Sequence, residues 1–197
     1  MRKRTGEARE NRHVRSKPNS GQGRKGVQWD EEDLLAKVEA GSVSFVAILD
    51  CVQDPHNLGA ILRTADGAGV QAVIVPKDKS AGITDTVRRI SVGAADSVPF
   101  VKVTNLVRTM KSLQSSGMWL VGTSDKADKT LYETDLRGKL GVVIGAEGDG
   151  LRRLTEEACD FLVKLPMLGK VPCLNASVAT GVCLYEAVRQ RGEAATD

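Results

Sequence analysis

The chain has 197 residues, of which 41% are hydrophobic and 4% aromatic, and its formal net charge is +3 at pH 7. This length allows one well-buried domain and excludes two large ones. No apolar run approaches the ~18 residues of a membrane span, and the charged N-terminus lacks an apolar signal segment, so we expect neither a membrane association nor secretion. The few aromatic residues argue against a stacking platform for single-stranded nucleic acid.

Cysteine and histidine usage predicts no metal site. The four cysteines form no C-x-x-C pair, and the two histidines are far apart in the sequence. These residues are Cys51, Cys159, Cys173 and Cys183, with His13 and His56. We therefore expect reduced thiols and a cytoplasmic location.

The charge is distributed unevenly. Residues 1–26 hold nine Lys/Arg and two Asp/Glu, a net of +7, so the remainder carries a net of −4. This basic segment has almost nothing apolar to bury, and we expect residues 1–28 to form a disordered arm. Such an arm gathers phosphates through counterion release, whereas a solvated tail or linker is the alternative.

Hydrophobic spacing predicts alternating helices and strands from residue 29 onward. A short linker helix is expected over 29–40, capped by Asp30 and ended by Gly41, within a linker at 29–42. The predicted strands are 43–49, 72–75, 99–103, 118–122, 140–144 and 161–165. The predicted helices that follow them are 58–68, 84–95, 105–114, 152–158 and 175–189, the last with Leu174, Val178, Val182 and Tyr185 along one face. This alternation predicts one α/β domain over 43–197 with a mostly parallel sheet flanked by helices.

Three polar stretches follow predicted strands, where ligands bind in open parallel sheets. They are 54–63, 144–151 and 165–177. Each candidate residue also has a simpler interpretation. Asn57 and Asn175 suit helix N-caps, Arg63 suits a helix surface and Glu147 suits a solvated loop. Their joint placement favours a site, while the glycine spacing at 145, 148 and 150 matches neither a dinucleotide fingerprint nor a Walker A loop.

The three stretches resemble the motifs of the SpoU/TrmH family of RNA ribose 2′-O-methyltransferases in the SPOUT superfamily. The first is similar to N-x-G-A-x-x-R, with Asn57, Gly59, Ala60 and Arg63. The second resembles G-x-E-G-x-G-L, with Gly145, Glu147, Gly148, Gly150 and Leu151. The third resembles L-P-M followed by L-N-x-S-V-A, from Leu165-Pro166-Met167 to Leu174, Asn175, Ser177, Val178 and Ala179. The phrases 74–78 and 185–191 are closest to the branch that methylates a guanosine ribose in 23S rRNA.

The resemblance implies a deep C-terminal trefoil knot, a homodimer and S-adenosylmethionine as the cofactor. It places Arg63, Glu147 and Asn175 in the catalytic group, with Asn57 supporting them. It assigns the cofactor to Gly145, Leu165 and Leu174, and we add Thr123, Ala146, Gly148 and Met167. For the RNA substrate we expect Arg63, Ser177 and Cys173.

Family members are described with the first-motif Arg as a base. An Arg side chain stays protonated at physiological pH and is a reluctant base, so we favour Arg63 as a clamp on phosphate and on the developing alkoxide. One departure from the motifs is Cys173, where a Ser is usual, and here we expect a small packing residue. Relatives usually carry an N-terminal RNA-binding domain, and the roughly 40 residues before the first strand are too few for one.

The leading prediction is a methyltransferase acting on ribosomal RNA. The alternatives are a transfer-RNA ribose methyltransferase and a non-catalytic RNA-binding assembly factor. A nucleotide-dependent oxidoreductase is disfavoured because its glycine fingerprint is missing.

Overall fold

The computed structural model describes residues 27–193, so the arm predicted at 1–28 lies almost entirely outside the described residues. A seven-stranded sheet in the order β3-β2-β1-β6-β4-β7-β5 forms the centre, and all six pairings between its strands are parallel. The strands are β1 (Phe45–Leu49), β2 (Ala72–Pro76), β3 (Phe100–Val103), β4 (Trp119–Thr123), β5 (Lys129–Thr130), β6 (Leu140–Ile144) and β7 (Phe161–Lys164).

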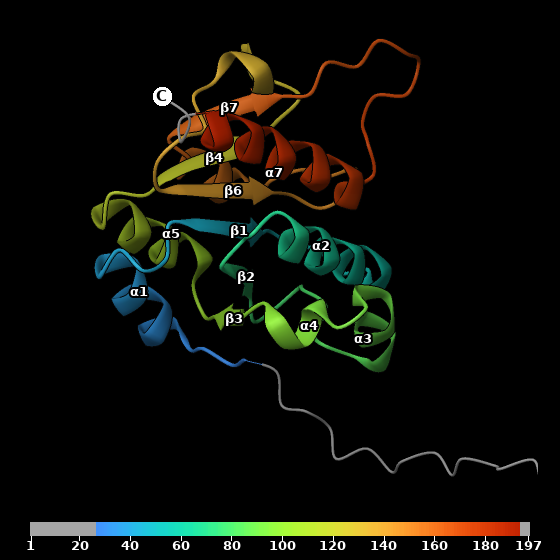
Figure 1. Ribbon diagram of the computed structural model, residues 1–197. Coiled ribbons are helices and arrows are strands. Elements are labelled where there is room, and N and C mark those ends of the chain that lie inside the picture. The colour runs from blue at the N-terminus through green and yellow to red at the C-terminus, as the bar shows by residue number, and fades with distance from the viewer. Residues whose placement is uncertain (1–26, 194–197) are drawn as a thin grey trace, which may run out of the picture.

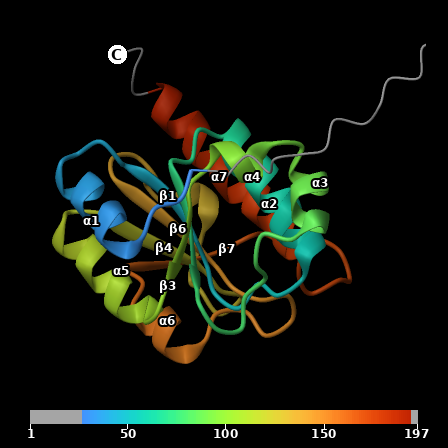
Figure 2. The same ribbon diagram turned by 90° about the horizontal axis from the view of Figure 1, so that it is seen from below.

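Helices cover both faces of the sheet, as the uninterrupted burial of β1, β2 and β6 requires. Figure 2 shows α1, α5 and α6 on one side and α2, α3, α4 and α7 on the other. The helices are α1 (Glu31–Glu39), α2 (Pro55–Gly67), α3 (Asp85–Ser91), α4 (Ala94–Ser97), α5 (Leu106–Ser115), α6 (Arg153–Glu157) and α7 (Ala176–Glu193), with a 3-10 turn η1 (Leu131–Glu133). Among the described residues, none of these helices has the length and apolar character of a membrane span.

Alternate residues of each strand supply two hydrophobic clusters. Phe45, Ala47 and Leu49 of β1 face the cluster under α2 and α7, whereas Val46 and Ile48 face the cluster under α1 and α5. This alternation follows from the two-residue period of a strand. The result is the predicted α/β class: a parallel sheet between two helical layers (Figure 1).

The structure differs from the predicted elements in one helix and in two short elements that were not predicted. The helix expected over 84–95 is broken into α3 and α4, because Val92 and Gly93 both adopt left-handed backbone, with φ of 52° and 97°. The two-residue strand β5 and the turn η1 were not predicted, since two residues are too short for a periodic pattern.

The predicted face of the last helix enters the core only in part, because Val182 packs against the core and other members of the face do not. Val178 and Tyr185 are each 52% exposed, while Cys183, Leu184 and Ala187 are buried against the sheet. The short helix α1 begins after Asp30 in a capping box, as predicted, and it buries Leu34 and Val38.

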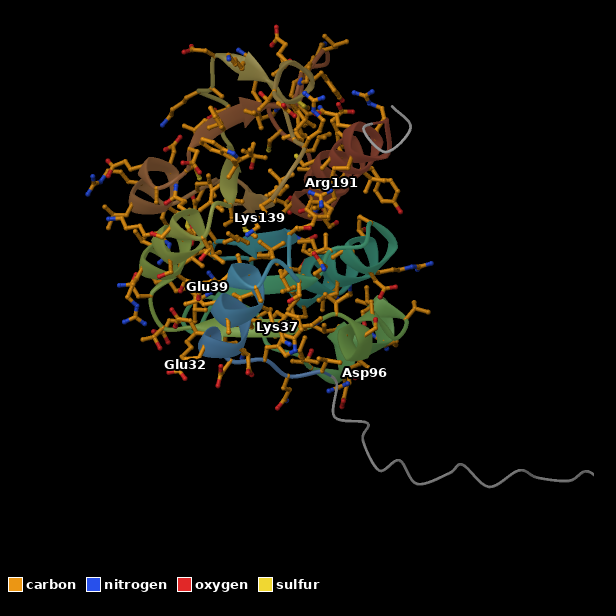
Figure 3. All side chains as sticks on the ribbon, turned by 60° about the vertical axis from the view of Figure 1, so that its left-hand side comes forward. Glu32, Lys37, Glu39, Asp96, Lys139 and Arg191 are labelled. Carbon is orange, nitrogen blue, oxygen red and sulfur yellow. The ribbon has the colours of Figure 1, made fainter. Side chains whose placement is uncertain are left out.

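The edge of the sheet where the strands begin is closed by long basic side chains. The Lys139 amine donates to the Val38 and Ser116 carbonyls at 3.2 and 3.1 Å, tying α1 and α5 together. Arg191, near the end of α7, lies over the Phe45 ring at 4.8 Å. Figure 3 labels both residues. The opposite edge, where β1, β6 and β7 end, is the one from which the three polar loops leave the sheet.

Candidate active site

The first loop brings Asn57 to the carboxyl end of β1. The Asp54 carboxylate accepts from the His56 backbone N–H at 3.0 Å and caps α2, and Pro55 occupies the first helical turn. The interpretation of Asn57 as an N-cap is therefore wrong. Asn57 lies inside the first turn and is buried, so its amide must find partners elsewhere.

The second loop is a tight turn that projects a carboxylate from the end of β6. Ala146 and Gly150 exchange two backbone hydrogen bonds of 3.0 Å, which close the turn. A Cβ at Gly145 would lie 2.1 Å from the carbonyl carbon of Gly150, so only glycine permits this crossing. Glu147 stands at the exposed tip of the turn.

The third loop ends at Asn175, which caps α7 as predicted and also contacts the other two loops. Its carbonyl oxygen accepts from the Ser177 backbone N–H at 2.9 Å and from the Ser177 hydroxyl at 2.7 Å, and so caps α7. Its amide nitrogen donates to the Glu147 carboxylate at 2.9 Å and to the Asn57 carbonyl oxygen at 3.0 Å. One side chain therefore starts a helix and joins the other two loops.

Three side chains from distant parts of the sequence meet at this edge. Besides the bonds from Asn175, the Asn57 amide donates to the same Glu147 oxygen at 3.3 Å. Two donors on one carboxylate oxygen form charge-assisted bonds, which fix the rotamers of all three residues. The expectation that the loops after the predicted strands one, five and six converge is confirmed for these three.

Arg63 is not part of this network. It lies about 9 Å farther along α2 than Asn57, given the helical rise. It is exposed, and no hydrogen bond or ion pair joins it to another residue within 27–193. Its guanidinium is therefore available to a ligand from outside this chain segment.

The predicted cofactor residues lie at the ends of neighbouring strands. Thr123 ends β4, Gly145 follows β6 and Leu165 follows β7, and these strands are adjacent in the sheet. Leu165, Met167 and Leu174 are half-buried. Cys173 is exposed, so its interpretation as a packing residue is wrong; it remains at the surface of this loop.

A charged pair at the same edge was not predicted. Asp50, directly after β1, is fully buried and pairs with Arg152, which follows the glycine turn. The signal in the sequence was an acidic residue at the end of an apolar run, which alone does not reveal a partner 102 residues away.

The family model described as "SpoU rRNA Methylase family" matches residues 44–185, which include all three loops. The chain belongs to the SpoU rRNA methylase family. This assignment fits the parallel sheet and the three loops at its carboxyl edge, and it confirms the family resemblance of the motifs.

Curated SpoU relatives share more than half of the aligned residues. The chain is 60% identical over 166 residues to "23S rRNA (guanosine-2'-O-)-methyltransferase RlmB" of Pseudomonas aeruginosa, covering 83% of this chain and 66% of that protein. It is 56% identical over 169 residues to the protein of the same name from Pectobacterium atrosepticum, covering 86% and 69%. The chain thus spans about two thirds of the length of these relatives.

Solved SpoU structures share the fold. The methyltransferase AviRb of Streptomyces viridochromogenes, solved in complex with the cofactor AdoMet, has a TM-score of 0.71 at 32% identity over 77% of this chain and 62% of that one. The A. aeolicus TrmH/SpoU tRNA modifying enzyme has a TM-score of 0.71 at 30% identity, covering 84% and 86%.

Proposed function

We propose that this chain is an S-adenosylmethionine-dependent methyltransferase that modifies the ribose 2′-hydroxyl of a guanosine in 23S rRNA. The observation that carries the proposal is the hydrogen-bonded group of Asn57, Glu147 and Asn175 at the carboxyl edge of the sheet. Relatives named for this reaction share 56–60% identity with the chain, which supports the same substrate class.

The loops at this edge suit the proposed cofactor. Half-buried Leu165, Met167 and Leu174 offer apolar contacts for a flat ring, and the turn at 145–150 offers backbone donors and acceptors. Thr123 and the backbone of Ala146 and Gly148 complete the set. When bound, S-adenosylmethionine supplies an electrophilic methyl group.

The chain's own residues would position the RNA for an in-line displacement, in which alignment supplies much of the rate. Asn57, Glu147 and Asn175 form the rigid base of the site. Arg63 would hold a phosphate and stabilise the charge that develops on the ribose oxygen. Ser177 and Cys173, near Asn175 in the sequence, would contact the RNA.

The knot implied by the family is proposed for the C-terminal part of a methyltransferase domain at 43–197, which follows the linker helix and the arm. The Gln190 side chain of α7 accepts from the Leu136 N–H at 2.8 Å and donates to the Thr134 carbonyl at 3.1 Å. The segment between β4 and β6 is thereby fastened to α7, while β7 lies between β4 and β5. Pulling the ends apart in an optical trap tests this: a knot leaves the extended chain shorter than its full contour.

A homodimer is proposed through the outer face of α7. Val178 and Tyr185 are 52% exposed on this helix, and Leu168 and Val171 of the preceding loop are 99% and 66% exposed. Burying such side chains favours association. Light scattering should give twice the mass of the chain, and Val178→Asp should return it to a monomer. If light scattering gives the wild-type protein the mass of a single chain, the homodimer proposal is wrong.

The test of the reaction uses purified protein, labelled S-adenosylmethionine, and both ribosomal and transfer RNA from cells that lack the gene. We expect label in 23S rRNA at one guanosine. The phosphodiester bond that follows this guanosine should resist alkaline hydrolysis. Label in transfer RNA only would support the tRNA alternative, and binding without transfer would support an assembly factor. Because its substrate is ribosomal RNA, the proposal also places the protein in the cytoplasm.

A further inference from the structure

One residue, Asp50, contacts both ends of the turn that carries Glu147, with its backbone at one end and its buried carboxylate at the other. The backbone N–H of Asp50 donates to the Ile144 carbonyl at 2.7 Å, where the turn leaves β6. The Asp50 side chain is 0% exposed and accepts from the Arg152 backbone N–H at 2.9 Å, where the turn ends. Residues 145–151 are therefore closed onto the end of β1, the same strand that leads to Asn57.

The Arg152 side chain completes the attachment. Its Nε and Nη2 lie 2.7 and 2.6 Å from Oδ1 of Asp50, whereas the Arg152 backbone N–H donates to Oδ2. The Arg152 side chain is 46% exposed. A fully buried carboxylate requires matched donors, because an unpaired charge there has lost its hydration. The Asp50 hydrogen bond correspondingly raises the pKa of the Arg152 guanidinium. Arg152 thus has one position that satisfies the buried charge, and the end of the turn follows that position.

The position of the turn determines where the Glu147 carboxylate lies. Inside the turn, the pair of bonds between Ala146 and Gly150 fixes its shape, but these bonds do not fix its direction relative to the sheet. Asp50 restrains this direction at both ends, with its backbone N–H at Ile144 and its carboxylate at Arg152, and only the second contact depends on its side chain. The Glu147 oxygen must still reach the Asn175 amide at 2.9 Å and the Asn57 amide at 3.3 Å.

We propose that Asp50 is a positioning residue for methyl transfer, acting through Arg152 to set where Glu147 meets Asn57 and Asn175. This inference rests on the proposed function. Asp50 is 0% exposed, so it would act on the reaction only through the residues that it holds.

The test compares Asp50→Asn with Glu186→Gln. Glu186 is also a buried carboxylate paired with an arginine, Arg189, at 2.7 Å, but it lies about 16 Å along α7 from Asn175. We expect Asp50→Asn to lower kcat by about 100-fold, as a misplaced catalytic group does, with KM for RNA nearly unchanged. Glu186→Gln should leave kcat unchanged.

Hydrogen exchange on the protein alone separates positioning from activity. In Asp50→Asn the amides of Gly150 and Arg152 should exchange at least about 10-fold faster, while the Asp160 amide should not change. Unchanged loop exchange together with wild-type kcat would overturn the inference. If wild-type protein transfers no methyl group, the proposed function fails, and the exchange result still decides whether Asp50 holds the turn.

A second variant covers the case in which Asp50→Asn does not fold. Arg152→Lys keeps the backbone N–H and the positive charge, but it offers one nitrogen in place of the two that now reach Asp50. We expect a loss in kcat of about 10-fold with faster exchange at Gly150. Wild-type values of both in a folded Arg152→Lys protein would contradict the inference.

Discussion

A carboxylate oxygen that accepts from two carboxamides has little freedom to move. Glu147 is in this state, and each carboxamide is held in turn, Asn175 by its cap on α7 and Asn57 by burial. Such mutual restraint orders a site before a ligand arrives, which reduces the free-energy cost of ordering it later. The restraint of these three side chains therefore favours catalysis by positioning.

Replacing Glu147 by Gln tests this restraint. The amide keeps the size of the carboxylate but removes its charge, and it weakens the two charge-assisted bonds. We expect single-turnover methyl transfer to fall by at least about 10-fold with an unchanged thermal midpoint. Asp149→Asn, in the same exposed turn, is the matched control and should retain full activity. Equal rates in both variants would show that the network is dispensable.

Arg63→Ala tests the proposed clamp. Because Arg63 has no hydrogen bond or ion pair among the residues described here, its loss should not affect folding. We expect methyl transfer to fall by more than about 100-fold while calorimetry gives an unchanged Kd for S-adenosylmethionine. Lys111→Ala, an exposed cation on α5, is the control. Near-normal turnover of Arg63→Ala would disprove the role.

Single residues differ in how far the sequence predicts them. The meeting of Asn57, Glu147 and Asn175 could be predicted, because each lies in a loop after a predicted strand and matches a motif. Asp50 and Arg152 could not be paired, because a contact between residues 50 and 152 depends on which strands become neighbours. Cys173 was misplaced because its size suggested packing, whereas burial is set by the path of the whole loop.

At the scale of elements, the turn after β6 depends on a glycine that admits no side chain. A Cβ at Gly145 would meet the Gly150 backbone at 2.1 Å, and backbone atoms cannot yield as a flexible side chain does. Gly145→Ala should therefore open the turn and lower the free energy of unfolding by about 1–3 kcal/mol. Chemical denaturation measures this, and the same sample should lose methyl transfer.

Gly169→Ala is the matched control for that change. Gly169 lies in the loop before α7, where an added Cβ meets nothing within 4 Å and the backbone φ is not positive. The free energy of unfolding of Gly169→Ala should equal that of the wild type. If Gly145→Ala is as stable and as active as the wild type, the prediction that the turn requires glycine at position 145 is wrong.

Helices and strands were predictable from the sequence where their hydrophobic patterns were long. The buried runs of β1, β2 and β6 lie within a residue or two of their predicted bounds, because a parallel strand covered on both faces is apolar throughout. The break between α3 and α4 was not predicted, because Val92 is β-branched and such residues rarely adopt left-handed backbone. There the surrounding structure overrides local preference.

At the scale of the whole molecule, the strand order explains why the site forms where it does. β1 lies between β2 and β6, so the loops after β1 and β6 are neighbours although 90 residues separate Asn57 from Glu147. The alternation of elements predicted the α/β class, but not this order. The order depends on how helices and sheet pack together, which no local pattern contains.

Charge is also divided at this scale, with a net of +7 in residues 1–26 and −4 in the remainder. An acidic domain repels RNA, so a basic arm would supply the attraction. Deleting residues 1–26 should weaken binding to a 23S rRNA fragment. It should also flatten the plot of log affinity against log salt by about 0.7 for each arm cation that contacts a single-stranded phosphate.

Two further variants of the arm separate the effect of its charge from that of its sequence. An arm with its nine Lys/Arg replaced by Gln keeps the length and should behave like the deletion, whereas a scrambled arm of the same composition should bind like the wild type. Counterion release depends on the number of cations near phosphate and not on their order. Methyl transfer at saturating RNA should be equal in all of them, because the site lies in the folded domain. If the deletion leaves both affinity and salt dependence unchanged, the arm is a linker and the domain binds RNA with its own surface.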